Sequence, residues 1–145
     1  MRKKVVIVVL SLLFILPNIK AQDWGIGARL GYWEDMAYSL DVKKYNTNSS
    51  LEFIGTYYDN NNIEFTFLYE WKTKFCKHFD FYYGYGASVG DWDNDLGFGL
   101  NGVLGVEYFI PLTKFSLAVD WAPQLRLVPE RDFMGNLSFI IKYYF

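Results

Sequence analysis

The chain has 145 residues, of which 52% are hydrophobic and 21% aromatic, and it carries 14 basic and 16 acidic residues with one histidine and one cysteine. This length suits a single domain. One cysteine excludes a disulfide framework and a cysteine-rich zinc site.

The first 21 residues have the layout of a secretory signal peptide. A basic start at residues 2–4 precedes an apolar run from Val5 to Leu16, and Pro17 and Ala21 follow it. A membrane-spanning helix needs about 20 apolar residues, so this run is too short for one. We therefore expect a signal peptide at 1–21 in preference to an uncleaved N-terminal anchor, and one domain at 22–145.

The mature chain that remains is acidic. Removal of residues 1–21 takes away four basic residues and no acid, which leaves ten basic and sixteen acidic residues. An acidic chain with no basic cluster along its sequence is a poor nucleic-acid binder. No nucleic-acid partner is therefore expected.

Apolar and polar residues alternate with period two through most of the remaining chain, which is the signature of β-strands. In chain order the alternation predicts strands at about 24–32, 37–45, 50–58, 62–72, 79–90, 97–110, 114–127 and 134–145. Turn-forming residues separate these strands, including the stretches 46–48, 59–61, 73–78 and 91–95. Pro123 lacks a ladder donor, so a local irregularity is expected in the seventh strand.

An even number of antiparallel strands can close into a barrel, and closure removes the exposed sheet edges. A soluble barrel turns its apolar face inward, whereas an outer-membrane barrel turns it outward. Here the apolar face carries no charge, and the opposite face combines charges with glycine, serine, threonine and asparagine. Such a polar face fits a narrow closed lumen. The predicted fold class is therefore all-β, an eight-stranded antiparallel up-and-down transmembrane β-barrel.

Charged residues on the inward face are predicted to pair with one another, because buried charges must offset their lost hydration. Eight strands leave an interior just wide enough for side chains to fill. The first and eighth strands meet when the barrel closes, so Arg29, Arg126 and Lys142 are expected to be neighbours. The predicted lumen charge network comprises Arg29, Glu52, Glu70, Glu107, Asp120, Arg126 and Lys142.

Aromatic residues of the apolar face fall towards the ends of the strands. This distribution predicts two girdles that flank an apolar band, as in barrels that span lipid. One predicted girdle contains Trp24, Tyr69, Trp71, Phe79, Phe81, Tyr108, Phe115, Tyr143 and Phe145, and the other contains Tyr32, Tyr38, Tyr57 and Phe98.

Short motifs at 27–31, 67–71, 100–108 and 117–123, and the C-terminal stretch 137–145, carry a more specific signal. Together they resemble a family of small bacterial outer-membrane β-barrel proteins, related in architecture to the eight-stranded OmpA/OmpX-type barrels. The resemblance covers the whole mature chain and implies a Gram-negative outer-membrane location in contact with outer-membrane lipid. It also implies that the barrel assembly machinery reads the terminal strand as an assembly signal finished by Phe145. The family supplies no catalytic residues.

Motifs that could carry chemistry have simpler interpretations. Gly97 to Gly102 match the glycine pattern of dinucleotide-binding proteins, but that pattern needs a following helix, and these glycines lie within a predicted strand. Cys76 and His78 share a predicted turn, which gives no fixed geometry between a nucleophile and a base. Two such residues are also too few for a metal site. We expect no cofactor, metal or catalytic site, with an intermolecular disulfide through Cys76 as an open alternative.

The predicted function is that of a small non-enzymatic outer-membrane barrel with a structural or interaction role and a lumen closed by side chains. Three alternatives stay open: a lipid-modifying outer-membrane enzyme, a narrow pore and a soluble ligand-binding barrel. An enzyme would need a histidine near a serine or aspartate at the outer rim, whereas His78 falls in a predicted periplasmic turn. A pore would need a free bore, which large inward residues restrict.

Overall fold

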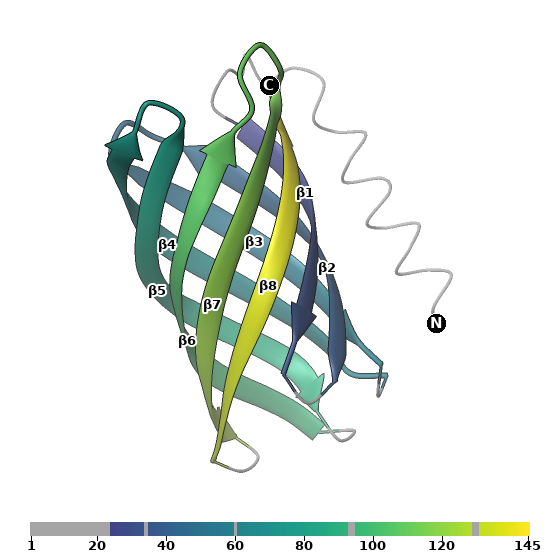
Figure 1. The fold of residues 1–145 in the computed structure, drawn as a ribbon. Helices are drawn as coiled ribbons and strands as arrows, with labels where there is room; N and C mark the ends of the chain where they lie inside the picture. The colour runs from purple at the N-terminus through teal and green to yellow at the C-terminus, as the bar shows by residue number, and fades with distance from the viewer. Residues whose placement is uncertain (1–23, 34, 60, 93–94, 129–130) are drawn as a thin grey trace.

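The computed structural model describes residues 24–33, 35–59, 61–92, 95–128 and 131–145, and the predicted signal peptide lies outside them. Within these ranges no helix is long and apolar enough to cross a membrane. The strands wind around one axis (Figure 1). In chain order they are β1 (Trp24–Tyr32), β2 (Met36–Tyr45), β3 (Ser49–Tyr58), β4 (Ile63–Cys76), β5 (Phe79–Trp92), β6 (Asp95–Phe109), β7 (Phe115–Val128) and β8 (Asp132–Tyr144).

The sheet closes on itself. Each strand pairs antiparallel with its neighbour in sequence, and β1 pairs with β8, beginning with Gly25 opposite Tyr144. Beyond that pair the backbones of Trp24 and Phe145 exchange hydrogen bonds of 3.3 and 2.8 Å. The predicted eight-stranded antiparallel up-and-down barrel is confirmed. The start of β1 and the end of β8 share one rim, here called the terminal rim, and the other end is called the opposite rim (Figure 1).

The β4–β5 hairpin is longer than the sequence predicts. A turn was expected over 73–78, but β4 continues through Cys76, and Lys77 and His78 form the turn. The last four residues of β4 are all exposed, so the alternation of burial ends here although the strand continues. A register shift between Lys74 and Cys76 absorbs one extra residue. Such a bulge inserts an extra residue into one strand, so the strand continues past the position at which the sequence predicts a turn.

The irregularity expected at Pro123 is present. The β6–β7 ladder passes from Asn101 opposite Gln124 to Leu104 opposite Trp121, and the described residues between these pairs form no ladder partners across the two strands. Proline has no backbone N–H to donate, so the ladder is interrupted beside it.

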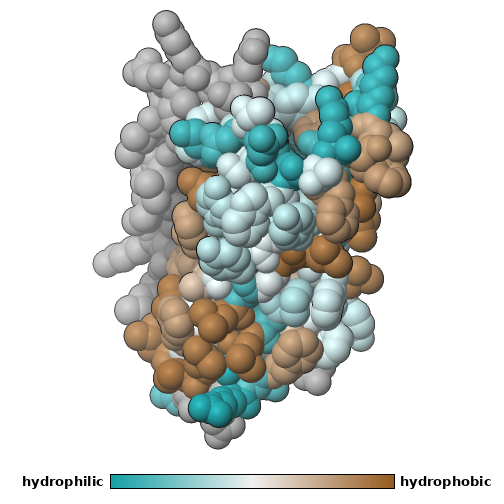
Figure 2. All heavy atoms as spheres, turned by 90° about the vertical axis from the view of Figure 1, so that its left-hand side faces the viewer, coloured by the Kyte–Doolittle hydropathy of each residue, from teal (hydrophilic) through white to brown (hydrophobic). Residues whose placement is uncertain are grey.

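Apolar side chains cover the outside of the barrel, and charged side chains lie inside it. On the outer face Leu40 and Tyr85 are 58% and 63% exposed, whereas the inward Lys43 and Glu52 are fully buried. Strand alternation produces this inversion because successive side chains point to opposite faces. Figure 2 shows one side of the wall, where brown hydrophobic and pale residues cover the middle and hydrophilic residues gather at the upper end.

Aromatic side chains mark both ends of the outer apolar band. Near the terminal rim, Phe79 and Tyr108 have ring centroids 4.7 Å apart, and Phe115 and Tyr143 have centroids 5.3 Å apart. The ring of Phe145 lies 6.1 Å from that of Tyr143. Towards the opposite rim the exposed aromatic residues of the outer face include Tyr32, Tyr38, Tyr57 and Phe98. This arrangement matches the two girdles of a barrel built for lipid.

Two inward glycines allow neighbouring groups to approach closely. A Cβ at Gly86 would collide with the carbonyl oxygen of Phe67 on β4. A Cβ at Gly27 would collide with the carboxylate of Asp41 and lie 2.6 Å from Cγ of Lys142. Gly27 therefore makes room for the charged side chains of the lumen.

Candidate functional site

The main polar feature of the barrel is a group of charged side chains in the lumen, here called the ionic cluster. Its members come from seven strands because every inward position near the middle of the barrel faces the same narrow space. All are at most 5% exposed. The ionic cluster comprises Arg29, Asp41, Lys43, Glu52, Glu70, Glu107, Asp120 and Lys142.

Arg29 on β1 is the centre of this cluster. Its guanidinium nitrogens lie 3.1 Å from the Asp120 carboxylate on β7, 3.2 Å from Glu52 on β3 and 3.5 Å from Asp41 on β2. Tyr82 on β5 donates a 2.8 Å hydrogen bond to the same Asp120 carboxylate. These contacts join strands on different sides of the barrel, so the side chains span the bore.

Two buried lysines complete the cationic part of the cluster. Lys142 Nζ lies 2.6 Å from the Glu52 carboxylate and 3.7 Å from that of Asp41. Lys43 Nζ lies 2.6 Å from the Glu70 carboxylate and 3.9 Å from that of Glu107. Buried ion pairs need such further partners because each charge has lost its hydration.

Hydroxyl groups satisfy much of the remaining acceptor capacity. Tyr45 on β2 and Ser116 on β7 donate hydrogen bonds of 2.8 and 2.7 Å to Glu107 on β6. Ser50 donates a 3.0 Å hydrogen bond to Glu70. The contact between β2 and β6 crosses the barrel a second time, nearer to the terminal rim.

The ionic cluster contains more carboxyl groups than cationic groups. Its eight members include five carboxylates and three cationic side chains. Asp41 is the least well paired carboxylate, since both of its oxygens lack a hydrogen-bond donor and its cations, Arg29 and Lys142, lie 3.5 and 3.7 Å away. Loss of a cation from this cluster should therefore cost more than loss of Asp41.

The structure brings together six of the seven residues of the predicted lumen network: Arg29, Glu52, Glu70, Glu107, Asp120 and Lys142. Arg126 faces the lumen as predicted, but its predicted place beside Arg29 and Lys142 was wrong. Arg126 lies six positions beyond Asp120 on β7, about 20 Å at the usual rise per residue, and it pairs in register with Asp132 near the opposite rim. Its guanidinium lies 4.3 Å from the ring centroid of Trp92.

Lys43 and Asp41 belong to the cluster but were not in the predicted network. Their inward position was available from the alternation of β2, since Ser39, Asp41 and Lys43 alternate with outward apolar residues. What the sequence lacks is the distance across the barrel. Lys43 meets Glu107 on β6, a strand that its own strand never pairs with.

A second polar group lies towards the opposite rim. The Glu64 carboxylate on β4 accepts hydrogen bonds of 3.1 Å from Trp92 Nε1, 3.0 Å from Gln124 Nε2 and 3.1 Å from Thr66 Oγ1. Gln124 also donates a 2.7 Å hydrogen bond to Ser88. The indole of Trp92 is 1% exposed. These side chains from β4, β5 and β7 fill the lumen on this side.

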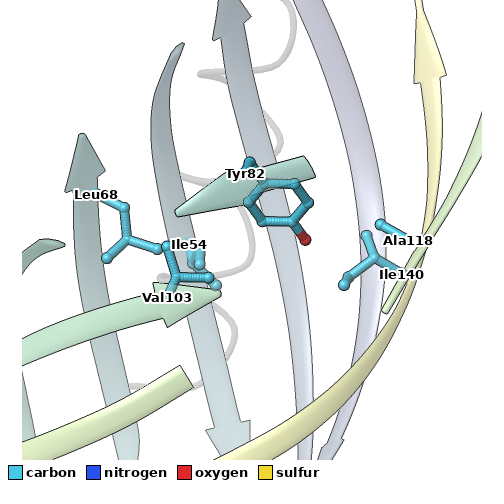
Figure 3. Packing of buried hydrophobic residues seen from close by; sticks show 6 residues of the cluster. All are labelled: Ile54, Leu68, Tyr82, Val103, Ala118 and Ile140. Atoms are coloured by element: carbon cyan, nitrogen blue, oxygen red, sulfur yellow. The ribbon is translucent and has the colours of Figure 1, made fainter. Parts of the chain in front are cut away.

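Apolar side chains fill part of the lumen beside the ionic cluster. The buried apolar residues there are Ile54, Leu68, Tyr82, Val103, Ala118 and Ile140. Figure 3 shows Ile54, Leu68 and Val103 close together and the Tyr82 ring between them and Ile140. Tyr82 therefore contributes both an apolar ring and the hydroxyl that binds Asp120.

The free volume inside the barrel is small. A cavity of about 40 Å³ lies on the opposite-rim side of Arg29, with Thr56, Asn101, Gln124 and Asn136 among its lining residues. This volume has room for roughly three water molecules. The three amide side chains each turn an oxygen with no protein hydrogen-bond partner into this part of the lumen, which suits a hydrated pocket. A shallow hollow of about 420 Å³ at the terminal rim is lined by Tyr45, Asn46, Thr47 and Lys72.

The residues considered for chemistry in the sequence lie apart from the lumen. Cys76 is an exposed free thiol at the end of β4, and the backbone carbonyl of His78 accepts a 2.8 Å hydrogen bond from Phe109. The glycine pattern from Gly97 to Gly102 lies within β6, as predicted. In the described part of the chain, no group of three or more histidine, cysteine or acidic residues has the arrangement of a metal site.

Comparison with known proteins gives a consistent picture. No protein-family model matches this chain, and no curated protein matches its sequence. The N-terminal β-barrel domain of Pseudomonas aeruginosa OprF superposes with a TM-score of 0.69 at 12% identity, over 85% of this chain and 98% of that one. A de novo designed transmembrane β-barrel gives a TM-score of 0.68 at 12% identity, over 87% and 98% of the two chains. This chain has the fold of the small outer-membrane barrels.

The fold does not select an activity. The outer-membrane enzyme PagL also superposes, with a TM-score of 0.60 at 13% identity over 83% of this chain and 99% of that one. One architecture thus carries an enzyme as well as a designed barrel, because function depends on the site and not on the fold.

Proposed function

We propose that the protein is a small outer-membrane β-barrel with a structural or interaction role, that it is not an enzyme, and that its side chains close its lumen. The supporting observation is the inverted distribution of polarity, with an ionic cluster inside and an apolar wall with two aromatic girdles outside. In water this arrangement would expose a large apolar surface, whereas in lipid it buries that surface.

The proposed orientation places the terminal rim at the periplasm and the opposite rim at the cell exterior. An exported chain with an even number of strands returns its end to the side on which it started. The four connections at the opposite rim span only two to four residues, although exterior loops of such barrels are usually the longer ones. Short loops offer little surface for a large extracellular partner, which favours a structural role.

A closed lumen predicts that the barrel does not conduct ions. Arg29 reaches Glu52 and Asp120 on other sides of the barrel, and Tyr45 reaches Glu107 across it, so side chains obstruct the bore at two levels. Planar-bilayer recording of the refolded protein should show no steady channel. Stable open conductance from the unmodified barrel would replace the structural proposal with the pore alternative.

Phe145 is proposed as the assembly signal that the barrel assembly machinery reads. Its backbone completes the β1–β8 seam through Trp24, and its ring extends the aromatic contacts of Tyr143. Phe145→Asp should lower outer-membrane levels several-fold, because it adds a charge at the apolar rim and removes the terminal aromatic residue. Phe75→Asp, at a residue 75% exposed near the end of β4, is the matched control. Equal levels of the two variants would argue against a signal role.

A further inference from the structure

Barrel closure gathers lysines that are scattered along the sequence. The exposed or half-buried lysines near the terminal rim come from β2, β4 and two turns. They are Lys44, Lys72, Lys74, Lys77 and Lys114, with His78 beside them. Among the residues described at that rim, Asp80 is the one acidic side chain that is not buried. The terminal rim therefore carries a positive charge that the acidic composition of the chain conceals.

The opposite rim carries the reverse charge. Its described residues include five aspartates and two arginines. The barrel is thus polarised along its axis, with its positive end at the chain termini. The aspartates are Asp35, Asp59, Asp91, Asp95 and Asp132, and the arginines are Arg131 and Arg126, of which Arg126 pairs in register with Asp132.

The lysines lie beside the aromatic girdle of the terminal rim. Lys44 Nζ lies 5.7 Å from the ring centroid of Trp24. Lys114 directly precedes Phe115, whose ring contacts Tyr143 in the girdle. Aromatic girdles sit at the headgroup level of a membrane, and lysine side chains near them extend their ammonium groups into the headgroup layer. The ammonium groups of these lysines therefore lie at the same depth in the membrane as the lipid phosphates.

We infer that the terminal rim binds the headgroups of anionic phospholipids in the leaflet next to it. This inference rests on the proposed membrane location and names a lipid class for it. In the proposed orientation the leaflet is the periplasmic one. The partner is a lipid because the girdle places the ammonium groups at headgroup depth. Each lysine near an anionic surface strengthens the association about fivefold.

The test compares lipid retention by the detergent-solubilised, refolded barrel in native mass spectrometry. The probe is an equimolar mixture of phosphatidylglycerol and phosphatidylcholine with identical acyl chains. Wild-type protein should retain phosphatidylglycerol in preference, and the preference should fall as the ionic strength rises. In the variant Lys44→Gln/Lys77→Gln/Lys114→Gln, the ratio of retained phosphatidylglycerol to retained phosphatidylcholine should fall at least tenfold. These three lysines make no contact with the ionic cluster, so the lumen is unchanged.

The matched control is Asp59→Asn/Asp91→Asn/Asp95→Asn, which removes three charges from the opposite rim and should leave the preference unchanged. A folded lysine variant with undiminished preference, or wild-type protein that retains both lipids equally, would overturn the inference. Folding is checked by the different gel mobility of unheated and heated samples. A barrel that inserts into vesicles but shows no lipid preference would refute the inference alone, whereas one that never inserts would refute the proposed membrane location.

Discussion

Replacement of Arg29 by methionine should be the most destabilising single change in the lumen. Methionine keeps much of the volume of arginine but removes the cation that contacts Asp41, Glu52 and Asp120. Five buried carboxylates would then face two cations. Removing one partner from a buried ion pair costs about 3–5 kcal/mol, and the excess of carboxyl groups over cationic groups places this variant at the upper end. Urea unfolding of the barrel refolded into vesicles measures the loss.

The control for this experiment is Asp41→Asn, at a member of the same cluster with the opposite charge. Asparagine leaves four carboxylates and three cations, and it can donate a hydrogen bond where two carboxylate oxygens now lack a donor. We expect unchanged or higher stability, in contrast to the large loss in the arginine variant. A loss in Asp41→Asn as large as that in Arg29→Met would show that the charge balance does not control lumen stability.

A positive charge placed in the middle of the outer wall should also have a large effect. Leu40 lies at the centre of β2, opposite Ala28 on β1, and is 58% exposed. Arginine on the lipid face of a barrel costs about 2–4 kcal/mol at the membrane midplane and much less near the interfaces. Leu40→Arg should therefore lower the free energy of unfolding in vesicles by about that amount.

Leu112→Arg provides the matched control for the outer wall. Leu112 is fully exposed in the β6–β7 turn at the terminal rim, where arginine meets water or headgroups. The same substitution there should change stability by less than about 1 kcal/mol. A soluble barrel would tolerate arginine at both sites, so equal and small effects would contradict the membrane proposal.

The number of strands was predictable from local alternation alone, and the direction of each face was predictable once the composition of the polar face was added. Outward residues such as Leu40 and inward residues such as Glu52 follow a period of two that a narrow barrel enforces on every strand. Strand ends depend on details that alternation does not contain. The bulge between Lys74 and Cys76 extends β4 beyond the turn signals near residue 73.

The contacts within the lumen could be predicted only in part. The alternation along each strand shows which charged side chains point into the barrel. For Arg29, Glu52 and Lys142 this was enough to predict that they join one charge network in the lumen. Their height along the axis depends on strand tilt and register, which the sequence does not reveal. Arg126 was wrongly grouped with Arg29 for this reason, and Lys43 was left out of the network although its Nζ lies 2.6 Å from Glu70.

The apolar residues of the lumen were also hard to anticipate. Ile54 and Leu68 lie in the inward phase of their strands, but the lumen was predicted from its charges. A narrow barrel must fill its volume as well as balance its charge. Tyr82 meets both needs, since its ring packs near Val103 and its hydroxyl binds Asp120.

The central claim is that the apolar outer wall requires lipid, and the most direct test is the medium in which residues 22–145 fold. The purified, urea-unfolded chain is diluted into plain buffer or into lipid vesicles and followed by far-ultraviolet circular dichroism and by gel mobility before and after heating. We expect β-structure and a heat-sensitive mobility shift in vesicles, and aggregation in buffer. A monodisperse, fully folded protein in buffer without detergent or lipid would contradict the claim and identify a soluble barrel.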